Sequence, residues 1–293
     1  MRLSLAALAL CLLTSVPAQR LALAQDEGSP DEAGPALPGT EVERVRLDLV
    51  SERPYLVPGT TTRLGVRLRI IPGWHVYWLN SGDTGLPTEV EVKGLPKGVS
   101  AGALLWPAPV RHAHEGLVDF VYEDEVTLIV PLTVAKDVPP GTKVPLEVRA
   151  SWLVCKEECV SGKGSASAAL EVGQQGGKPD PEHTAALARA AARLPSELPK
   201  DVVVRLEGTR LELRAPGATR LIWFPAQPEA TPPPLEGLDE QGELLRVDYP
   251  GAVRKAELLE GLLALTRGGK TTYHWIQLRP GRPGPGEGAG ARR

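Results

Sequence analysis

Apolar and polar residues alternate in short runs along most of the chain, and turn residues separate the runs. A period of two is typical of a β-strand that buries one face, and Pro and Gly mark the turns between such strands. The 29 Pro and 31 Gly residues fit frequent turns. The pattern therefore predicts an antiparallel β-sandwich over residues 41–173. Its apolar positions are Val45, Leu47 and Leu49; Leu64, Val66, Leu68 and Ile70; Val90 and Val92; the alternate residues of 126–134 and 144–152; and Ala168, Leu170 and Val172.

A second set of alternating runs follows a polar break and predicts a smaller β domain over residues 196–279. Residues 174–195 are predicted to be a linker that contains a helix, Glu182–Leu194, because this stretch is rich in alanine and Pro195 ends it. The residues 280–293 are rich in Gly, Pro and Arg and are predicted to be a disordered tail. The apolar runs of the second region are Val202 to Leu206, Leu211/Leu213, Leu221/Trp223, Leu244 to Tyr249, Leu258 to Leu265 and Tyr273 to Leu278.

The first residues have the form of a cleaved signal peptide. Arg2 precedes the apolar run Leu3–Val16, which is too short to span a bilayer, and Ala22-Leu23-Ala24 is a small-x-small cleavage site. We therefore expect a signal peptide over residues 1–24 and an acidic, disordered tether over residues 25–40. The chain is expected to be exported to the periplasm of a bacterium.

Composition excludes several classes of function. The 33 basic and 36 acidic residues are interspersed and give a net charge of −3, so no basic face for nucleic acid is indicated. No later segment has the roughly 20 apolar residues that a transmembrane helix needs. The sequence also contains no serine triad pattern, phosphate-binding loop or nucleotide fingerprint.

Two closely spaced cysteines are the clearest chemical feature. Of the 3 cysteines, Cys11 leaves with the signal peptide, and Cys155 and Cys159 remain in WLVCKEECVSGKG. Four residues of extended strand would separate their Cα atoms by about 13 Å, whereas a disulfide requires roughly 4.4–6.8 Å. The pair can therefore bond only if the intervening residues turn the chain, as a hairpin tip or as a single helical turn.

Three interpretations of the pair remain open from the residues alone. A structural disulfide is the commonest, but a five-residue loop would contribute only about 2 kcal/mol to stability. A redox-active disulfide is the second, since a tight bond on a turn is well suited to exchange. The third is a metal site, in which two thiolates bind Cu(I) with His112 or His114 nearby, although a zinc site would need more ligands than the sequence supplies.

Aromatic residues near the cysteines have a structural interpretation. Trp74, Tyr77 and Trp78 are expected to pack in the core rather than to form a docking surface, and His75 is expected to be an ordinary strand residue. Trp152 is expected to lie in the core beneath the cysteine hairpin. A turn is expected at Asp83, between Gly82 and Gly85.

Three stretches resemble the N-terminal periplasmic domain of the DsbD family of thiol:disulfide interchange proteins. They are GWHVYWLNSGDTGLPTEVEV (73–92), LLWPAPVRHAHEGLVDFVYEDEVTLIVPLTV (104–134) and ASWLVCKEECVSGKG (150–164). The resemblance covers about residues 41–173 and is greatest to the branch that includes the copper-sensitivity suppressor ScsB. The second β region and the connecting helix of this chain resemble the extension seen in that branch.

The resemblance implies an immunoglobulin-like sandwich that passes electrons to periplasmic thioredoxin-like proteins without a cofactor. Cys159 would form the mixed disulfide with the partner, and Cys155 would resolve it. A cap loop would correspond to residues 111–119, with His112, His114 and Glu115 as its candidate functional residues. Because the chain has no electron-carrying membrane segment, a separate membrane protein would have to reduce it. The rival hypothesis is a non-catalytic adaptor or copper-binding module with a structural disulfide.

Overall fold

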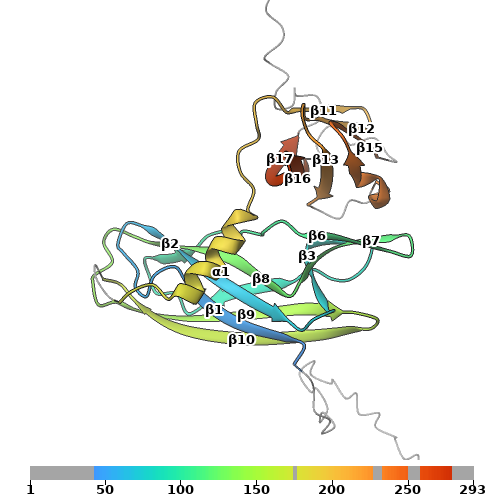
Figure 1. Ribbon diagram of the computed structural model, residues 1–293. Coiled ribbons are helices and arrows are strands. Elements are labelled where there is room, and N and C mark those ends of the chain that lie inside the picture. Colours follow the sequence, from blue (N-terminus) through green and yellow to red (C-terminus); the bar gives the residue numbers. More distant parts are fainter. Residues whose placement is uncertain (1–42, 174–176, 227–232, 250–257, 279–293) are drawn as a thin grey trace, which may run out of the picture. The chain divides into compact units, whose positions relative to one another are not determined.

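The computed structural model describes residues 43–173, 177–226, 233–249 and 258–278 (Figure 1). Within these residues the protein consists of antiparallel β-sheets and one α-helix. The predicted signal peptide, tether and C-terminal tail lie outside the described residues. The predicted alternation of buried and exposed positions is confirmed, and it is clearest in β9, where the even-numbered side chains are buried.

Two sheets from the first half of the chain pack into a sandwich. The first sheet has the order β1-β2-β8-β5, and the second has the order β10-β9-β3-β7-β6, with β4 also paired to β9. Their strands are β1 (Val45–Ser51), β2 (Thr61–Ile70), β3 (His75–Gly82), β4 (Glu89–Lys93), β5 (Val99–Ala101), β6 (Val110–His114), β7 (Leu117–Glu123), β8 (Glu125–Val134), β9 (Lys143–Cys155) and β10 (Cys159–Glu171).

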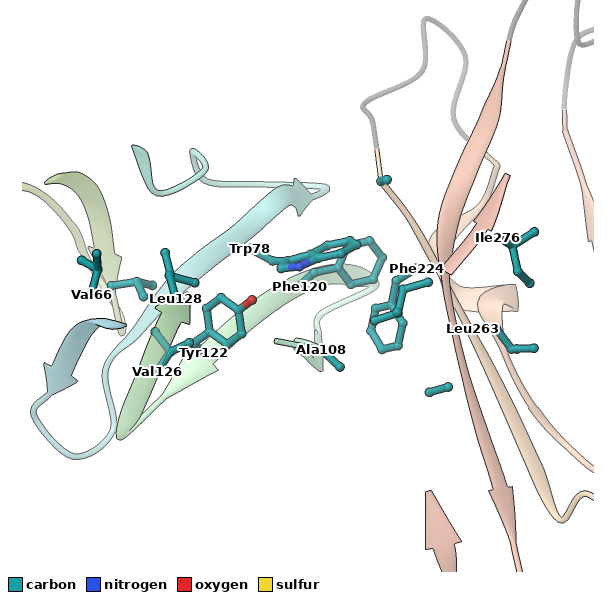
Figure 2. Close-up of a cluster of buried hydrophobic side chains, with 14 of the residues drawn as sticks. Val66, Trp78, Ala108, Phe120, Tyr122, Val126, Leu128, Phe224, Leu263 and Ile276 are labelled. Carbon is teal, nitrogen blue, oxygen red and sulfur yellow. The ribbon is translucent and has the colours of Figure 1, made fainter. Parts of the chain in front are cut away.

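The core of this sandwich lies between the inner faces of the two sheets. Val66 and Leu128 come from the first sheet, and Trp78 and Phe120 come from the second (Figure 2). The rings of Trp78 and Phe120 meet edge to face with their centroids 6.2 Å apart. The prediction that Trp78 packs in the core is therefore confirmed.

The second half of the chain forms two smaller sheets. Their orders are β11-β12-β15 and β14-β13-β16-β17. The predicted strand runs of this region are confirmed, whereas its separation as an independent domain stays a prediction. The elements are β11 (Val203–Glu207), β12 (Arg210–Arg214), β13 (Arg220–Pro225), the 3₁₀ helix η1 (Leu235–Leu238), β14 (Asp239–Gln241), β15 (Leu244–Asp248), β16 (Leu259–Arg267) and β17 (Lys270–Leu278).

The helix α1 (Pro181–Ala192) packs on the outer face of the first sheet (Figure 1). Its buried side chains, Ala186, Leu187 and Ala190, contact Val50 of β1 and Ile129 of β8. The helix thus covers apolar residues of the sheet that point away from the sandwich core.

The bounds of α1 differ slightly from the predicted Glu182–Leu194. The helix begins one residue earlier because Asp180 caps it, accepting a hydrogen bond from the backbone N–H of Glu182 at 2.7 Å, and because Pro181 suits the first position. It ends before Leu194, since the residue that precedes a proline is disfavoured in the helical conformation.

Trp152 and the glycines of β10 fit together on the inner face of the second sheet. Trp152 is buried, and Gly162 is its direct partner across the β9–β10 ladder. A Cβ atom at Gly162 would lie 2.3 Å from the indole Nε1 of Trp152, and one at Gly164 would lie 3.0 Å from the edge of the ring. The two glycines therefore leave the space that the indole occupies, which confirms Trp152 as a core residue next to the cysteine hairpin.

The substitution Gly162→Ala should destabilise the protein because its methyl group would overlap the indole of Trp152. We expect a loss of about 1–3 kcal/mol in the free energy of unfolding, the usual cost of overpacking. Urea denaturation checks this expectation, with Ser161→Ala on the opposite, exposed face as the control. An unchanged urea midpoint for Gly162→Ala would show that the indole does not need this space.

Candidate functional site

Cys155 and Cys159 lie at the tip of the β9–β10 hairpin. Cys155 is the last residue of β9, Cys159 is the first residue of β10, and the two are direct partners in the ladder. A disulfide joins them, with their Cα atoms 4.1 Å apart. The backbone N–H of Lys156 donates to the carbonyl oxygen of Glu158 at 3.0 Å and closes the turn. Of the two expected solutions, the chain therefore adopts the hairpin tip.

The two sulfur-bearing residues differ in exposure. Directly opposed residues of antiparallel strands point to the same face, so both cysteines stand on the outer face of the sheet, away from the core. Cys155 is only 3% exposed, whereas Cys159 is exposed. A reagent in solution would therefore reach Cys159 more readily than Cys155.

Cys155 is shielded by a small apolar cluster on the outer face. Tyr77 of β3 and Val121 of β7 are buried with it, and Leu153 packs against the group. This cluster is separate from the sandwich core. Tyr77 is thus a packing residue, as predicted, but it packs on the cysteine side of the sheet.

A loop that we call the 82–88 loop covers Tyr77. A Cβ atom at Gly85 would lie 2.2 Å from the Tyr77 ring, and the hydroxyl of Thr88 donates to the Tyr77 carbonyl oxygen at 3.1 Å. Gly82 and Gly85 have φ values of 94° and 75°, which favour glycine. The predicted turn around Asp83 is therefore confirmed, and it forms part of the cover over the cysteine cluster.

Two carboxylates fasten the 82–88 loop to β7. Asp119 is buried, and its two oxygens accept hydrogen bonds from the backbone N–H of Thr84 at 2.9 Å and from the Thr84 hydroxyl at 2.7 Å. In return, Asp83 accepts a hydrogen bond from the backbone N–H of Val118 at 2.8 Å. Sequence reasoning did not single out Asp119 as a functional residue, because its partners lie 35 residues away.

The stretch expected to be a cap loop, residues 111–119, is instead a β-hairpin. β6 ends at His114, β7 begins at Leu117, and Glu115 and Gly116 form the turn with φ values of 49° and 81°. Two central residues with positive φ match the right-handed twist of a tight hairpin, which explains the pairing. Glu115 is exposed on this turn.

The predicted candidates His112 and His114 belong to a row of three imidazoles. The ring centroids of His112 and His114 are 5.3 Å apart, and those of His112 and His75 are 5.2 Å apart. His75 of β3 is in turn the direct ladder partner of Cys155. The row therefore runs from the β6–β7 hairpin to the buried cysteine. The signal that sequence analysis missed is His75, which was assigned only a structural role.

The environment of His75 lowers its pKa. It is buried, and desolvation disfavours its charged form; the neighbouring His112 adds to this effect, while the carboxylate of Asp119 opposes it. The His75 Nε2 lies 3.4 Å from the Tyr77 hydroxyl oxygen. Burial raises the pKa of Tyr77, so this hydroxyl stays protonated at neutral pH. His75 is thus a neutral imidazole at neutral pH.

The turn of the cysteine hairpin also contacts the beginning of the sandwich. Arg44 forms an ion pair with Glu158 at 3.3 Å, and its guanidinium lies 4.6 Å from the centre of the Trp74 ring. An exposed ion pair of this kind contributes little to stability. It does partly neutralise one of the two acidic charges beside Cys159.

No group of three or more His, Cys, Asp and Glu side chains arranged to hold a metal ion occurs in the part of the chain that the structure describes. Among the same residues, no helix is long and apolar enough to cross a membrane.

Comparison with protein families identifies the region that carries the cysteines. Residues 47–170 match the family model of the thiol:disulfide interchange protein DsbD, N-terminal. This chain contains a DsbD-family N-terminal domain. The resemblance found in the three sequence stretches is thereby confirmed. A search of curated proteins found no match.

Solved structures support the fold of this DsbD-family domain. The crystal structure of the N-terminal periplasmic domain of ScsB from Proteus mirabilis aligns with a TM-score of 0.57 and 15% sequence identity, covering 83% of this chain and 96% of that one. A match of this extent must continue beyond residues 47–170 into the second β region. The yeast GGA1 GAE domain (17% identity, TM-score 0.25, 44% and 93% coverage) and the E. coli chaperone DraB (13% identity, TM-score 0.24, 80% and 97% coverage) are too distant to indicate a shared fold.

Replacing both cysteines of the DsbD-family domain with serine should cost little stability. The disulfide closes a loop of five residues, and the loop-entropy model gives about 2 kcal/mol for a loop of that size. We therefore expect Cys155→Ser/Cys159→Ser to remain folded, with a free energy of unfolding lower by about 2 kcal/mol or less in urea denaturation. A double variant that fails to fold would show that the disulfide is a structural requirement.

Proposed function

We propose that this protein is an exported thiol–disulfide interchange protein that passes reducing equivalents through Cys155 and Cys159 to thioredoxin-like partners. The observation that carries the proposal is the unequal exposure of two bonded cysteines at a hairpin tip. Exchange needs one sulfur that a partner can reach and a second sulfur held close enough to complete the reaction. The match to the DsbD N-terminal family supports the same chemistry.

The proposed reaction needs no cofactor because the two cysteines carry the electrons. In the reduced protein, the Cys159 thiolate attacks one sulfur of the partner's disulfide, and the partner's other sulfur leaves as a thiolate. Cys155 then attacks the Cys159 sulfur, which re-forms the Cys155–Cys159 disulfide and releases the partner's second thiolate. Two electrons and two protons thus pass from the protein to its partner.

We place this reaction in the bacterial periplasm. The signal-peptide pattern of residues 1–24 and the likeness to the periplasmic domain of ScsB both support this location. There a separate membrane protein would return electrons to the Cys155–Cys159 disulfide. We further propose that the sandwich of residues 41–173 is immunoglobulin-like and that residues 196–279 form a second β domain, as its two additional sheets suggest.

The proposal predicts that the two single-cysteine variants behave differently toward a disulfide-containing partner. Cys155→Ser should accumulate a mixed disulfide through Cys159, because no second thiol remains to resolve it. Cys159→Ser should accumulate little or none, because Cys155 is shielded by Tyr77, Val121 and Leu153. Non-reducing gels of both variants after incubation with periplasmic extract, followed by mass spectrometry of the trapped species, measure this difference.

The double variant Cys155→Ser/Cys159→Ser is the control for non-covalent adhesion. Recovery of a thioredoxin-like protein with Cys155→Ser alone would support the proposal. Equal trapping by both single variants would remove the assigned roles, and trapping by neither would favour a non-catalytic adaptor.

A further inference from the structure

We propose that His75 is the proton acceptor for Cys155 when Cys155 resolves the mixed disulfide. The inference rests on the proposed exchange function and assigns its proton-transfer step. The burial of Cys155 makes its thiol harder to ionise. A thiol must lose its proton before it attacks a disulfide, and apolar surroundings disfavour the thiolate. Cys155 is 3% exposed, so water has little access to its thiol.

His75 is the titratable side chain that the sheet register places beside Cys155. The two residues are direct partners in the β3–β9 ladder. The Cβ atoms of such a pair lie about 4.5–5.5 Å apart, and both side chains stand on the same face. An imidazole is long enough to span that separation, so the register allows a ring nitrogen of His75 to approach the Cys155 sulfur.

His75 is in the charge state that a proton acceptor needs. Its lowered pKa keeps the imidazole neutral at neutral pH, so one ring nitrogen is free to accept a proton. The groups that surround it are Tyr77 on β3, His112 and His114 on β6, and Asp119 and Glu123 on β7. Asp119 lies close enough to favour the imidazolium that forms when the proton is taken.

The proton of the Cys155 thiol passes to an imidazole nitrogen of His75, and the Cys155 sulfur forms a bond to the Cys159 sulfur. The bond between Cys159 and the partner's sulfur breaks, and the partner leaves as a thiolate with the electron pair of that bond. His75 then returns its proton to the leaving thiolate or to water.

A small disulfide reagent tests this step without any protein partner. The reduced protein is mixed with one equivalent of 5,5′-dithiobis(2-nitrobenzoate), and release of thionitrobenzoate is followed by absorbance. The first release reports attack by Cys159, and the second reports resolution by Cys155. We expect His75→Gln to leave the rate of the first release unchanged and to slow the second release by about tenfold or more at pH 7. General acid–base catalysis usually contributes at least this much to a rate.

The pH dependence separates a proton acceptor from a packing residue. In the native protein the second rate should reach a plateau above the lowered pKa of His75 and should fall only below the ordinary histidine range. In His75→Gln the plateau should vanish, and the rate should rise steadily with pH as the Cys155 thiol ionises by itself. A native profile that follows thiol ionisation alone would overturn the proposal, even if His75→Gln does not fold.

Two matched variants complete the design. His274→Gln removes another buried histidine whose pKa is lowered by burial; it lies on β17, in a different sheet from the cysteines, and its loss should leave both rates unchanged. Tyr77→Phe removes the hydroxyl next to His75; if this variant loses the plateau while His75→Gln keeps it, His75 is not the acceptor and the proposal is wrong. The reagent assay and the trapping experiment can also give different answers. If thionitrobenzoate is released in two phases but the Cys155→Ser variant traps no partner, the proposed function is contradicted and the role of His75 is not.

Discussion

The pairing register of β9 and β10 is the constraint on which the site depends. The two strands form a ladder of 13 residue pairs that begins at Cys155–Cys159. Because side chains alternate between faces, a slip of one residue on one strand would leave the two cysteines on opposite faces. Packing of Trp152 against Gly162 specifies the same register on the inner face. Core packing on one face of the sheet thus aligns the disulfide on the other.

Packing on the outer face of the second sheet exposes one cysteine of the disulfide and buries the other. Tyr77, Val121 and Leu153 surround Cys155, and the hydrogen bonds of Asp119 hold the 82–88 loop over Tyr77. Cys159, which begins β10 after a charged turn, receives no such cover. A disulfide that serves only for stability gains nothing from this difference, since its small loop-closure contribution is the same whichever sulfur is exposed. Exchange chemistry does require it.

Much of this arrangement could be predicted from local sequence. The alternation of residues 144–152 predicted β9, and the spacing of Cys155 and Cys159 required a turn that the structure shows as a hairpin tip. The burial of Trp152 was also predicted, because its apolar neighbours follow the same period, and that of Trp78 was predicted because aromatic residues beside a Pro/Gly turn usually pack in the core. Local pattern is informative here because each of these features depends on residues close together in the chain.

The remaining features depend on pairing between distant strands. His75 lies 80 positions before its ladder partner Cys155, and no local pattern specifies which residues of two separate strands will face each other. The same reason explains why the bonds between Asp119 and Thr84 were missed. Residues 111–119, expected to be a cap loop, form a tight hairpin that the positive φ values of Glu115 and Gly116 allow and that the polar composition of the stretch did not reveal. The role of this hairpin as a cap over the cysteines stays a prediction.

The central claim is that the Cys155–Cys159 disulfide exchanges in the folded protein through its exposed sulfur. The most direct measurement reduces the native protein with dithiothreitol and labels it briefly with iodoacetamide, and mass spectrometry then locates the label while circular dichroism monitors folding. The account predicts reduction without loss of structure and labelling of Cys159 well before Cys155. A disulfide that is reduced only when the protein unfolds, or equal labelling of the two cysteines, would contradict it.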